Sequence, residues 1–183
     1  SQTVEISGGV PQTASGLFSA VSPGGQGNGG NIDLNTQTLT VNDGGQVVVS
    51  TAGLGNGGNL EILAKSIELS GGSPFGASGL FANAINSTGN GGNVQVNTDN
   101  LNINDGATIN VGNFSSRNTG IPPGQGAPGN IQINAESVVL NSQGTITADT
   151  LAGSKGNITL SSNSLDLLGN SSLSTNAQGD GSG

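Results

Sequence analysis

The chain has 183 residues, a net charge of −8, and no cysteine, histidine, methionine, tryptophan or tyrosine. The missing cysteines exclude a disulfide framework and a thiolate metal site. Three basic residues stand against eleven acidic ones, which argues against a nucleic-acid partner because phosphates are bound by clustered lysine and arginine. No apolar run approaches the roughly 20 residues of a membrane-spanning helix, so no membrane insertion is expected.

A glycine–asparagine pair followed by an apolar–x–apolar triplet occurs five times along the chain. Its asparagines lie 28, 34, 37 and 27 residues apart. Self-similarity at this period is typical of stacked repeat proteins, in which each repeat packs only against its neighbours. The repeated asparagines are Asn31, Asn59, Asn93, Asn130 and Asn157.

Each repeat predicts three short strands. The first two pairs of apolar positions show the period of two that is typical of strands with one buried face. They are separated by an odd step of five residues, so the chain must turn a corner between them. A third pair follows six residues later. Its first position is predicted to hold Val47, Phe75, Ile109, Ile146 and Leu173, with Gln12 as the exception, and its second Ala14, Val49, Ala77, Val111, Ala148 and Thr175.

Three strands in about 27 residues form one rung, meaning one turn, of a parallel β-helix. A propeller blade is excluded because it needs about 40–45 residues. The sequence therefore predicts a single all-β solenoid over residues 1–183, with five to six rungs. In chain order these are a partial rung at 1–30 and rungs at 31–58, 59–92, 93–129, 130–156 and 157–183.

The repeated asparagines are interpreted as a structural ladder at one corner of the solenoid. Stacked amides bond to the neighbours above and below while satisfying backbone groups of the bend. The alternative is that these asparagines bind a ligand.

Rung length is expected to vary after the third strand, where the connections Ala77–Gly92 and Val111–Gly129 are long. Insertions of this kind often form a binding face. The segments Ser15–Phe18 and Ser78–Phe81 repeat Ser-Gly-Leu-Phe, and their Leu-Phe pairs are interpreted as pinning the loops onto the solenoid rather than contacting a partner. The candidate contact residues in the loops are Leu80, Phe81, Phe114 and Arg117.

Asp33 and Glu61 share an outward column in neighbouring rungs. Such a pair suits a calcium site or a glycosidase-like acid pair. The column continues with Gln95, Gln132 and Thr159, so no third acid follows. We therefore expect no catalytic residue, no metal ion, no cofactor and no enzyme activity.

The pattern Gly-Asn-Gly-Gly-Asn-Ile, followed by triplets such as Leu39–Val41 and by Asn42-Asp43-Gly44, resembles the repeat region of filamentous-haemagglutinin-like exoproteins of two-partner secretion systems. The closest style is the cyanobacterial one. The resemblance covers essentially residues 1–183 and implies a right-handed parallel β-helix, secreted or displayed on a bacterial cell surface. It also implies an outer-membrane two-partner-secretion transporter as a partner, and it carries no catalytic residues.

These observations favour an adhesin-like structural shaft that presents loops to a cell receptor, a surface glycan or matrix. The alternative is a carbohydrate-active β-helix enzyme related to polysaccharide lyases or pectinases, which would need acids and a basic residue in one groove. The repeat is already under way at residue 1, and residues 179–183 stop where the next Gly-Asn is due. We therefore expect the chain to be a segment of a longer shaft.

Overall fold

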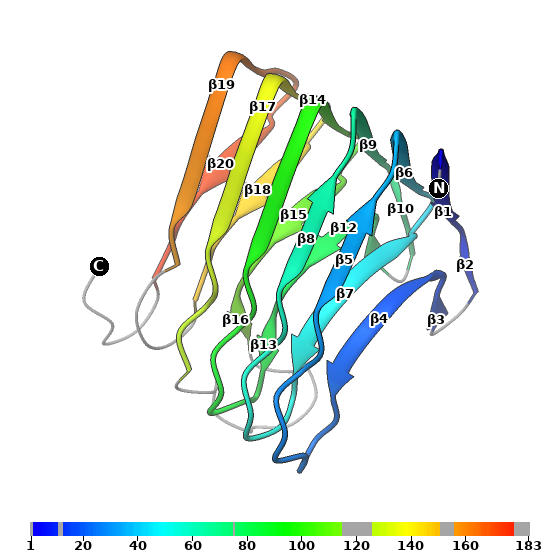
Figure 1. Ribbon diagram of the computed structural model, residues 1–183. Helices are drawn as coiled ribbons and strands as arrows, with labels where there is room; N and C mark the ends of the chain where they lie inside the picture. The colour runs from blue at the N-terminus through cyan, green and yellow to red at the C-terminus, as the bar shows by residue number, and fades with distance from the viewer. Residues whose placement is uncertain (1, 11–12, 75, 115–125, 151–155, 178–183) are drawn as a thin grey trace.

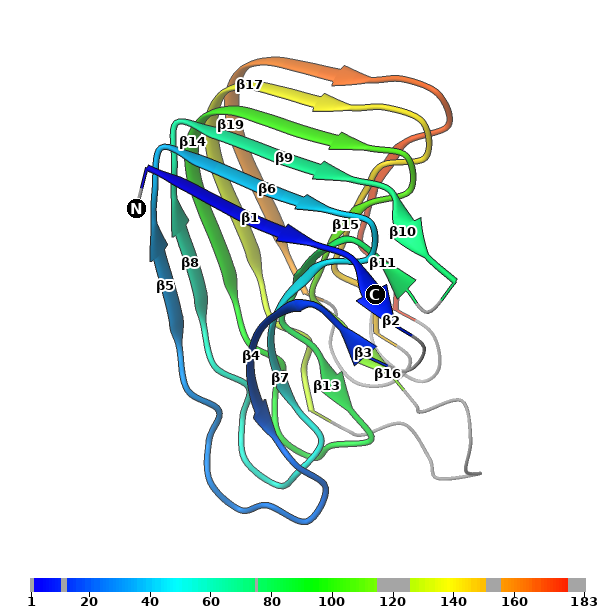
Figure 2. The same cartoon turned by 90° about the vertical axis from the view of Figure 1, so that its right-hand side faces the viewer.

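The computed structural model describes residues 2–10, 13–74, 76–114, 126–150 and 156–177. Within them the chain winds into a parallel β-helix of about five rungs (Figure 1). Viewed from the N-terminal end, the chain turns clockwise as it recedes, so the β-helix is right-handed (Figure 2). In this part of the chain no helix long and apolar enough to span a membrane is found.

Each rung has three sides, which are clearest along the stack (Figure 2). The first side holds β5 (Ile32–Asn35) and β8 (Leu60–Leu63), and the second holds β1 (Thr3–Ser7), β6 (Thr38–Asn42) and β9 (Ser66–Ser70). In the later rungs one long strand bends around the corner and serves both sides: β14 (Val94–Asn104), β17 (Ile131–Leu140) and β19 (Ile158–Leu167). The two predicted strands are therefore separate in the early rungs and continuous in the later ones.

The third side forms a second parallel sheet. It is built from β4 (Gly16–Val21), β7 (Gln46–Thr51), β12 (Gly79–Phe81), β15 (Thr108–Asn110), β18 (Thr145–Thr147) and β20 (Ser172–Ser174). Two short strands, β13 (Ala84–Ile85) and β16 (Asn113–Phe114), extend this sheet beside β7.

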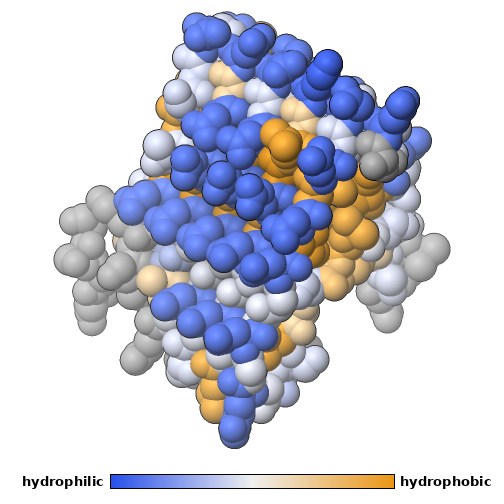
Figure 3. All heavy atoms as spheres, in the orientation of Figure 1, coloured by the Kyte–Doolittle hydropathy of each residue, from blue (hydrophilic) through white to orange (hydrophobic). Residues whose placement is uncertain are grey.

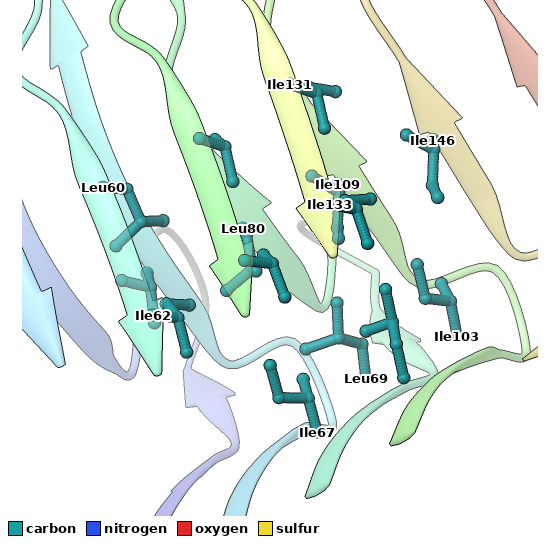
Figure 4. Packing of buried hydrophobic residues seen from close by; sticks show 14 of the residues in the cluster. Leu60, Ile62, Ile67, Leu69, Leu80, Ile103, Ile109, Ile131, Ile133 and Ile146 are labelled. Atoms are coloured by element: carbon teal, nitrogen blue, oxygen red, sulfur yellow. The ribbon is translucent and has the colours of Figure 1, made fainter. Parts of the chain in front are cut away.

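The stacking register joins equivalent positions of successive rungs. Leu60 pairs with Ile32 on one side and with Val94 on the other. The predicted apolar columns of the first and second sides are thus confirmed. Their side chains point into one continuous core, where most of them are fully buried (Figure 4). Each buried Leu or Ile contributes on the order of 1.5–3 kcal/mol before entropy is counted.

The odd five-residue step is explained by an inward-facing residue at the corner itself. Thr36 and Thr98 occupy this position and are buried. Each hydroxyl donates to a backbone carbonyl two residues ahead, that of Thr38 at 3.2 Å and that of Asn100 at 3.1 Å. The buried polar groups are therefore satisfied within the bend.

The corner between the second and third sides is a tight β-turn with two left-handed residues. In the rung of Asn31 they are Asp43 (φ 51°) and Gly44 (φ 87°), and the Gly45 N–H donates to the Asn42 carbonyl at 2.8 Å. Two consecutive positive φ values define a type I′ turn, which favours Asn, Asp and Gly. The Asn-Asp-Gly sequence recurs at 104–106 with the same backbone signs.

In two rungs a β-hairpin replaces this turn. The hairpins are β2–β3 (Gly9–Val10 and Thr13–Ala14) and β10–β11 (Gly72–Ser73 and Gly76–Ala77), both antiparallel. The prediction that Ala77–Gly92 carries the insertion after the third strand was wrong, because the hairpin lies before that strand. The other predicted insertion, at 111–129, lies largely outside the described residues.

The hairpins also correct the predicted third-strand columns. Leu80 pairs with Val47 and Ile109, and Leu17 pairs with Val47, so these leucines take the positions assigned to Phe75 and Gln12. Phe75 and Gln12 lie outside the described residues. The predicted Ala14 and Ala77 belong to the hairpins. The physical reason is that a hairpin of extra residues shifts every position after it, whereas the alignment assumed a constant spacing.

Candidate functional site

The outward side chains of the first side form polar rows that run along the stack. One row is the repeated asparagine, and a second, two residues later, begins with Asp33 and Glu61 and continues with Gln95 and Gln132. The space-filling view shows hydrophilic rows crossing the strands of this face (Figure 3). Because the rungs are in register, each row places equivalent polar side chains one above another at the strand spacing of about 4.8 Å.

The repeated asparagines form a hydrogen-bonded ladder. The Asn93 Oδ1 accepts the backbone N–H of Asn130 at 2.9 Å and the Asn130 Nδ2 at 3.1 Å. The Asn93 Nδ2 in turn donates to the Asn59 Oδ1 at 2.9 Å. The ladder begins at Asn31, whose Oδ1 accepts the Asn59 N–H, and ends at Asn157, which donates to Asn130. These side chains are exposed to solvent, although hydrogen bonds within the ladder hold them in place.

A second asparagine ladder, which was not predicted, runs beside the first. The Asn56 N–H donates to the Asn28 Oδ1, and the Asn90 N–H to the Asn56 Oδ1, both at 2.9 Å. The Ala127 N–H completes it on the Asn90 Oδ1 at 2.8 Å. The signal was present in the sequence, because Gly-Asn-Gly-Gly-Asn places an asparagine three residues before Asn31, Asn59 and Asn93.

Between the two ladders lies a hollow of about 400 Å³, which we name the glycine trough. It is lined by the ladder asparagines and by the backbone between them: Asn56, Gly57, Asn59, Asn90, Gly91, Asn93, Ala127, Pro128, Gly129 and Asn130. Glycine is needed here because the rungs stack backbone on backbone. A Cβ on Gly58 would collide with the carbonyl oxygen of Gly30, and a Cβ on Gly92 with that of Gly58.

On the other side of the first ladder lies a second hollow of about 400 Å³, which we name the amide trough. One wall is Asn59, Asn93 and Asn130, and the other is Glu61, Gln95 and Gln132. Its floor includes Leu60 and Val94, whose side chains are buried in the core. The trough crosses three rungs, so its long direction follows the stack rather than a strand.

The two acids of the outward row come together as predicted from the register. Asp33 pairs with Glu61 across β5 and β8, and both line a hollow of about 270 Å³ with Leu34, Asn35 and Leu63. Among the described residues no group of three or more Asp, Glu, His or Cys could hold a metal ion. The calcium and acid-pair interpretations therefore rest on two carboxylates alone.

The candidate contact residues are scattered. Leu80 is fully buried in β12, so its assignment to a contact loop was wrong. Phe81 follows it on the outward side of β12, and Phe114 lies in β16, both half-buried. Arg117 lies outside the described residues. The Leu-Phe pairs lie in strands, since Leu17-Phe18 and Leu80-Phe81 both pair with β7.

The fold is a β-solenoid, and it is consistent with a structural or adhesin-like segment. Its exposed polar rows and the two troughs are surface features to which a ligand could bind. Comparisons with protein-family models, with curated proteins and with solved structures find no match to this chain.

Proposed function

We propose that this chain is a non-enzymatic structural segment of a secreted, adhesin-like surface fibre of a bacterium. Its rigid β-helical shaft would hold contact surfaces at a fixed spacing for a cell receptor, a glycan or matrix. The resemblance to filamentous-haemagglutinin-like repeats motivates the extracellular setting and the outer-membrane transporter as export partner.

The supporting observation is the uninterrupted core of the stack. The same columns are filled with Leu, Ile or Val in successive rungs, as in Leu39, Ile67, Leu101 and Val138, all fully buried. Each rung therefore packs against the next along its whole inner surface, which gives a stiff unit without disulfides. Stiffness along one axis is the property that a fibre segment needs.

Attachment and degradation can be measured on the same protein. Beads coated with the chain are expected to attach saturably to cells or to immobilised polysaccharide, with no reducing ends or unsaturated products released from a polysaccharide panel. Release of such products would contradict the proposal and support the polysaccharide lyase or pectinase alternative. Beads that attach no better than albumin-coated beads would also contradict it.

The export partner can be checked in the genome. A gene for an outer-membrane two-partner-secretion transporter beside the gene of this protein is the expected arrangement. A neighbourhood of polysaccharide-degrading enzymes without such a transporter would count against export by this route.

A further inference from the structure

We propose that the amide trough binds a neutral, extended β-1,4-linked glycan that lies along the stack axis. The inference rests on the proposed contact function and names the ligand class and the surface. It moves the contact away from the loops, where the sequence placed it, to the first side of the β-helix.

The asparagine wall supplies fixed donors. An asparagine Nδ2 carries two hydrogens, and the ladder uses one of them, as in the bonds from Asn93 to Asn59 and from Asn130 to Asn93. The second N–H of each exposed side chain is left to meet a ligand. Because the ladder already holds these side chains in one geometry, a ligand loses little side-chain entropy by using them.

The opposite wall supplies acceptors. Glu61 offers carboxylate oxygens, and Gln95 and Gln132 offer amide oxygens together with further donors. A sugar hydroxyl both donates and accepts, so it can accept from an asparagine N–H on one wall and donate to a Glu or Gln oxygen on the other. The floor between the walls is the backbone at Leu60 and Val94, whose side chains are buried in the core, so no side chain rises between the two walls to block a sugar chain.

The spacing of the walls favours a polymer. The rows repeat once per rung at about 4.8 Å, and a monosaccharide unit in an extended β-1,4 chain advances by nearly the same distance. Successive sugars would therefore meet equivalent groups in the rungs of Asn59, Asn93 and Asn130. A coiled α-1,4 glycan does not keep this register along a straight trough.

Charge selects a neutral ligand. Among the described residues that line the amide trough and the glycine trough, none is basic, and Glu61 is acidic. The whole chain carries −8. A uronate or sulfated polymer would meet repulsion without a partner cation, whereas a neutral glycan would meet none.

The test compares two amide pairs on the same protein. Q95A/Q132A removes two of the three side chains of one wall and leaves Glu61. It does not touch the asparagine ladder, whose loss could unfold the rungs. N100A/N102A is the matched control, since it removes two outward amides of β14 away from the trough. Cellohexaose and mannohexaose are titrated by calorimetry, with maltohexaose and a galacturonate hexamer as comparison ligands, and circular dichroism verifies the fold of every variant.

The expected result is saturable binding of cellohexaose or mannohexaose with a Kd below about 1 mM, weakened about tenfold in Q95A/Q132A and less than about twofold in N100A/N102A. Four results would each overturn the proposal: no binding of either β-1,4 hexamer, an equal loss in both variants, tighter binding of the galacturonate hexamer, or tighter binding of maltohexaose. If the hexamers fail while coated beads still attach to cells, the glycan site is wrong and the contact function stands. If the beads fail as well, both proposals are wrong.

Discussion

At the residue scale, side-chain amides of asparagine form hydrogen bonds with the backbone as well as with one another. Each ladder asparagine before Asn157 accepts a backbone N–H of the next rung at a corner where the chain changes direction. The Asn130 N–H has the Asn93 Oδ1 at 2.9 Å, and the Ala127 N–H has the Asn90 Oδ1 at 2.8 Å. A side chain that is exposed to solvent is thus part of the hydrogen bonding that holds two rungs together.

Asn93→Ala is therefore expected to destabilise the protein by about 1–2 kcal/mol, because it leaves the backbone N–H and the Nδ2 of Asn130 without their common acceptor. Asn102→Ala, on the outward face of β14, the strand that follows Asn93, is expected to cost less than about 0.5 kcal/mol. Urea unfolding of the three proteins measures both differences. Equal midpoints for the two variants would show that the ladder adds no stability.

Adjacent residues of β12 allow a second comparison at this scale. Leu80→Ala is expected to cost about 2–5 kcal/mol, since Leu80 is fully buried in the core. Phe81→Ala is expected to cost less than Leu80→Ala because Phe81 is half-buried on the outer face. If unfolding curves showed the larger loss for Phe81→Ala, the register of β12 against β7 would be wrong.

At the scale of elements, the corner between the third and first sides depends on glycine, which allows successive rungs to approach closely. Between the two ladders the rungs approach so closely that their backbones touch, and side chains are absent from the contact. Gly92 and Gly129 illustrate this, since a Cβ on either would meet the carbonyl of the glycine one rung below. Glycine backbone at Gly57, Gly91 and Gly129 likewise lines the glycine trough, with Ala127 and Pro128 beside it in one rung.

Gly92→Ala is expected to destabilise the protein by several kcal/mol or to prevent folding, because the new methyl group would meet rigid backbone. Gly27→Ala is the matched change, since no heavy atom lies within 4 Å of its Cβ position and its φ is not left-handed. It is expected to be neutral or to stabilise by up to about 1 kcal/mol through the unfolded state. Thermal unfolding of both variants distinguishes these effects, with expression yield as a second readout for Gly92→Ala. Similar unfolding temperatures for the two variants would contradict the backbone contact at Gly92.

The accuracy with which the sequence predicts a strand depends on whether a fixed number of residues separates that strand from the Gly-Asn signal. The strands of Leu60 and Ile67 follow Asn59 at fixed offsets, so their inward positions were predicted correctly. The strand of Leu80 follows a hairpin of variable length, and the constant spacing chose Phe75 in its place. Both walls of the amide trough were predicted as rows, namely the asparagine ladder and the outward column of Glu61, Gln95 and Gln132. The troughs themselves were not predicted, because the space between two rows depends on the path of the backbone in three dimensions.

Over the whole molecule, burial changes from the middle of the stack to its last described rung. Val138 and Leu140 are fully buried in β17, whereas Leu165 and Leu167, their equivalents in β19, are 43% and 46% exposed. A solenoid is stabilised mainly by contacts between neighbouring rungs. Within the described residues, β14 has paired strands on both sides and β19 on one.

Hydrogen exchange is accordingly expected to be slowest in β14 and faster in β1 and β19. The reason is that a terminal rung opens by losing one interface, whereas a central rung must lose two. Exchange followed by mass spectrometry, with peptides covering 94–104 and 158–167, measures the difference. Uniform protection across the strands would contradict it and would show that the stack unfolds as a single unit.

The parallel stacking of rungs has a mechanical consequence. The hydrogen bonds between rungs point along the axis, and the covalent chain passes from one rung to the next only once per turn. A pull along the axis would therefore detach rungs from an end one at a time, and each would release 27 to 37 residues of chain. A released rung extends by about 90–130 Å, which is about 19 to 27 times the height of about 4.8 Å that it occupied in the stack. Under tension the protein would therefore lengthen in discrete steps. Each step would dissipate energy and lower the tension on the remaining rungs.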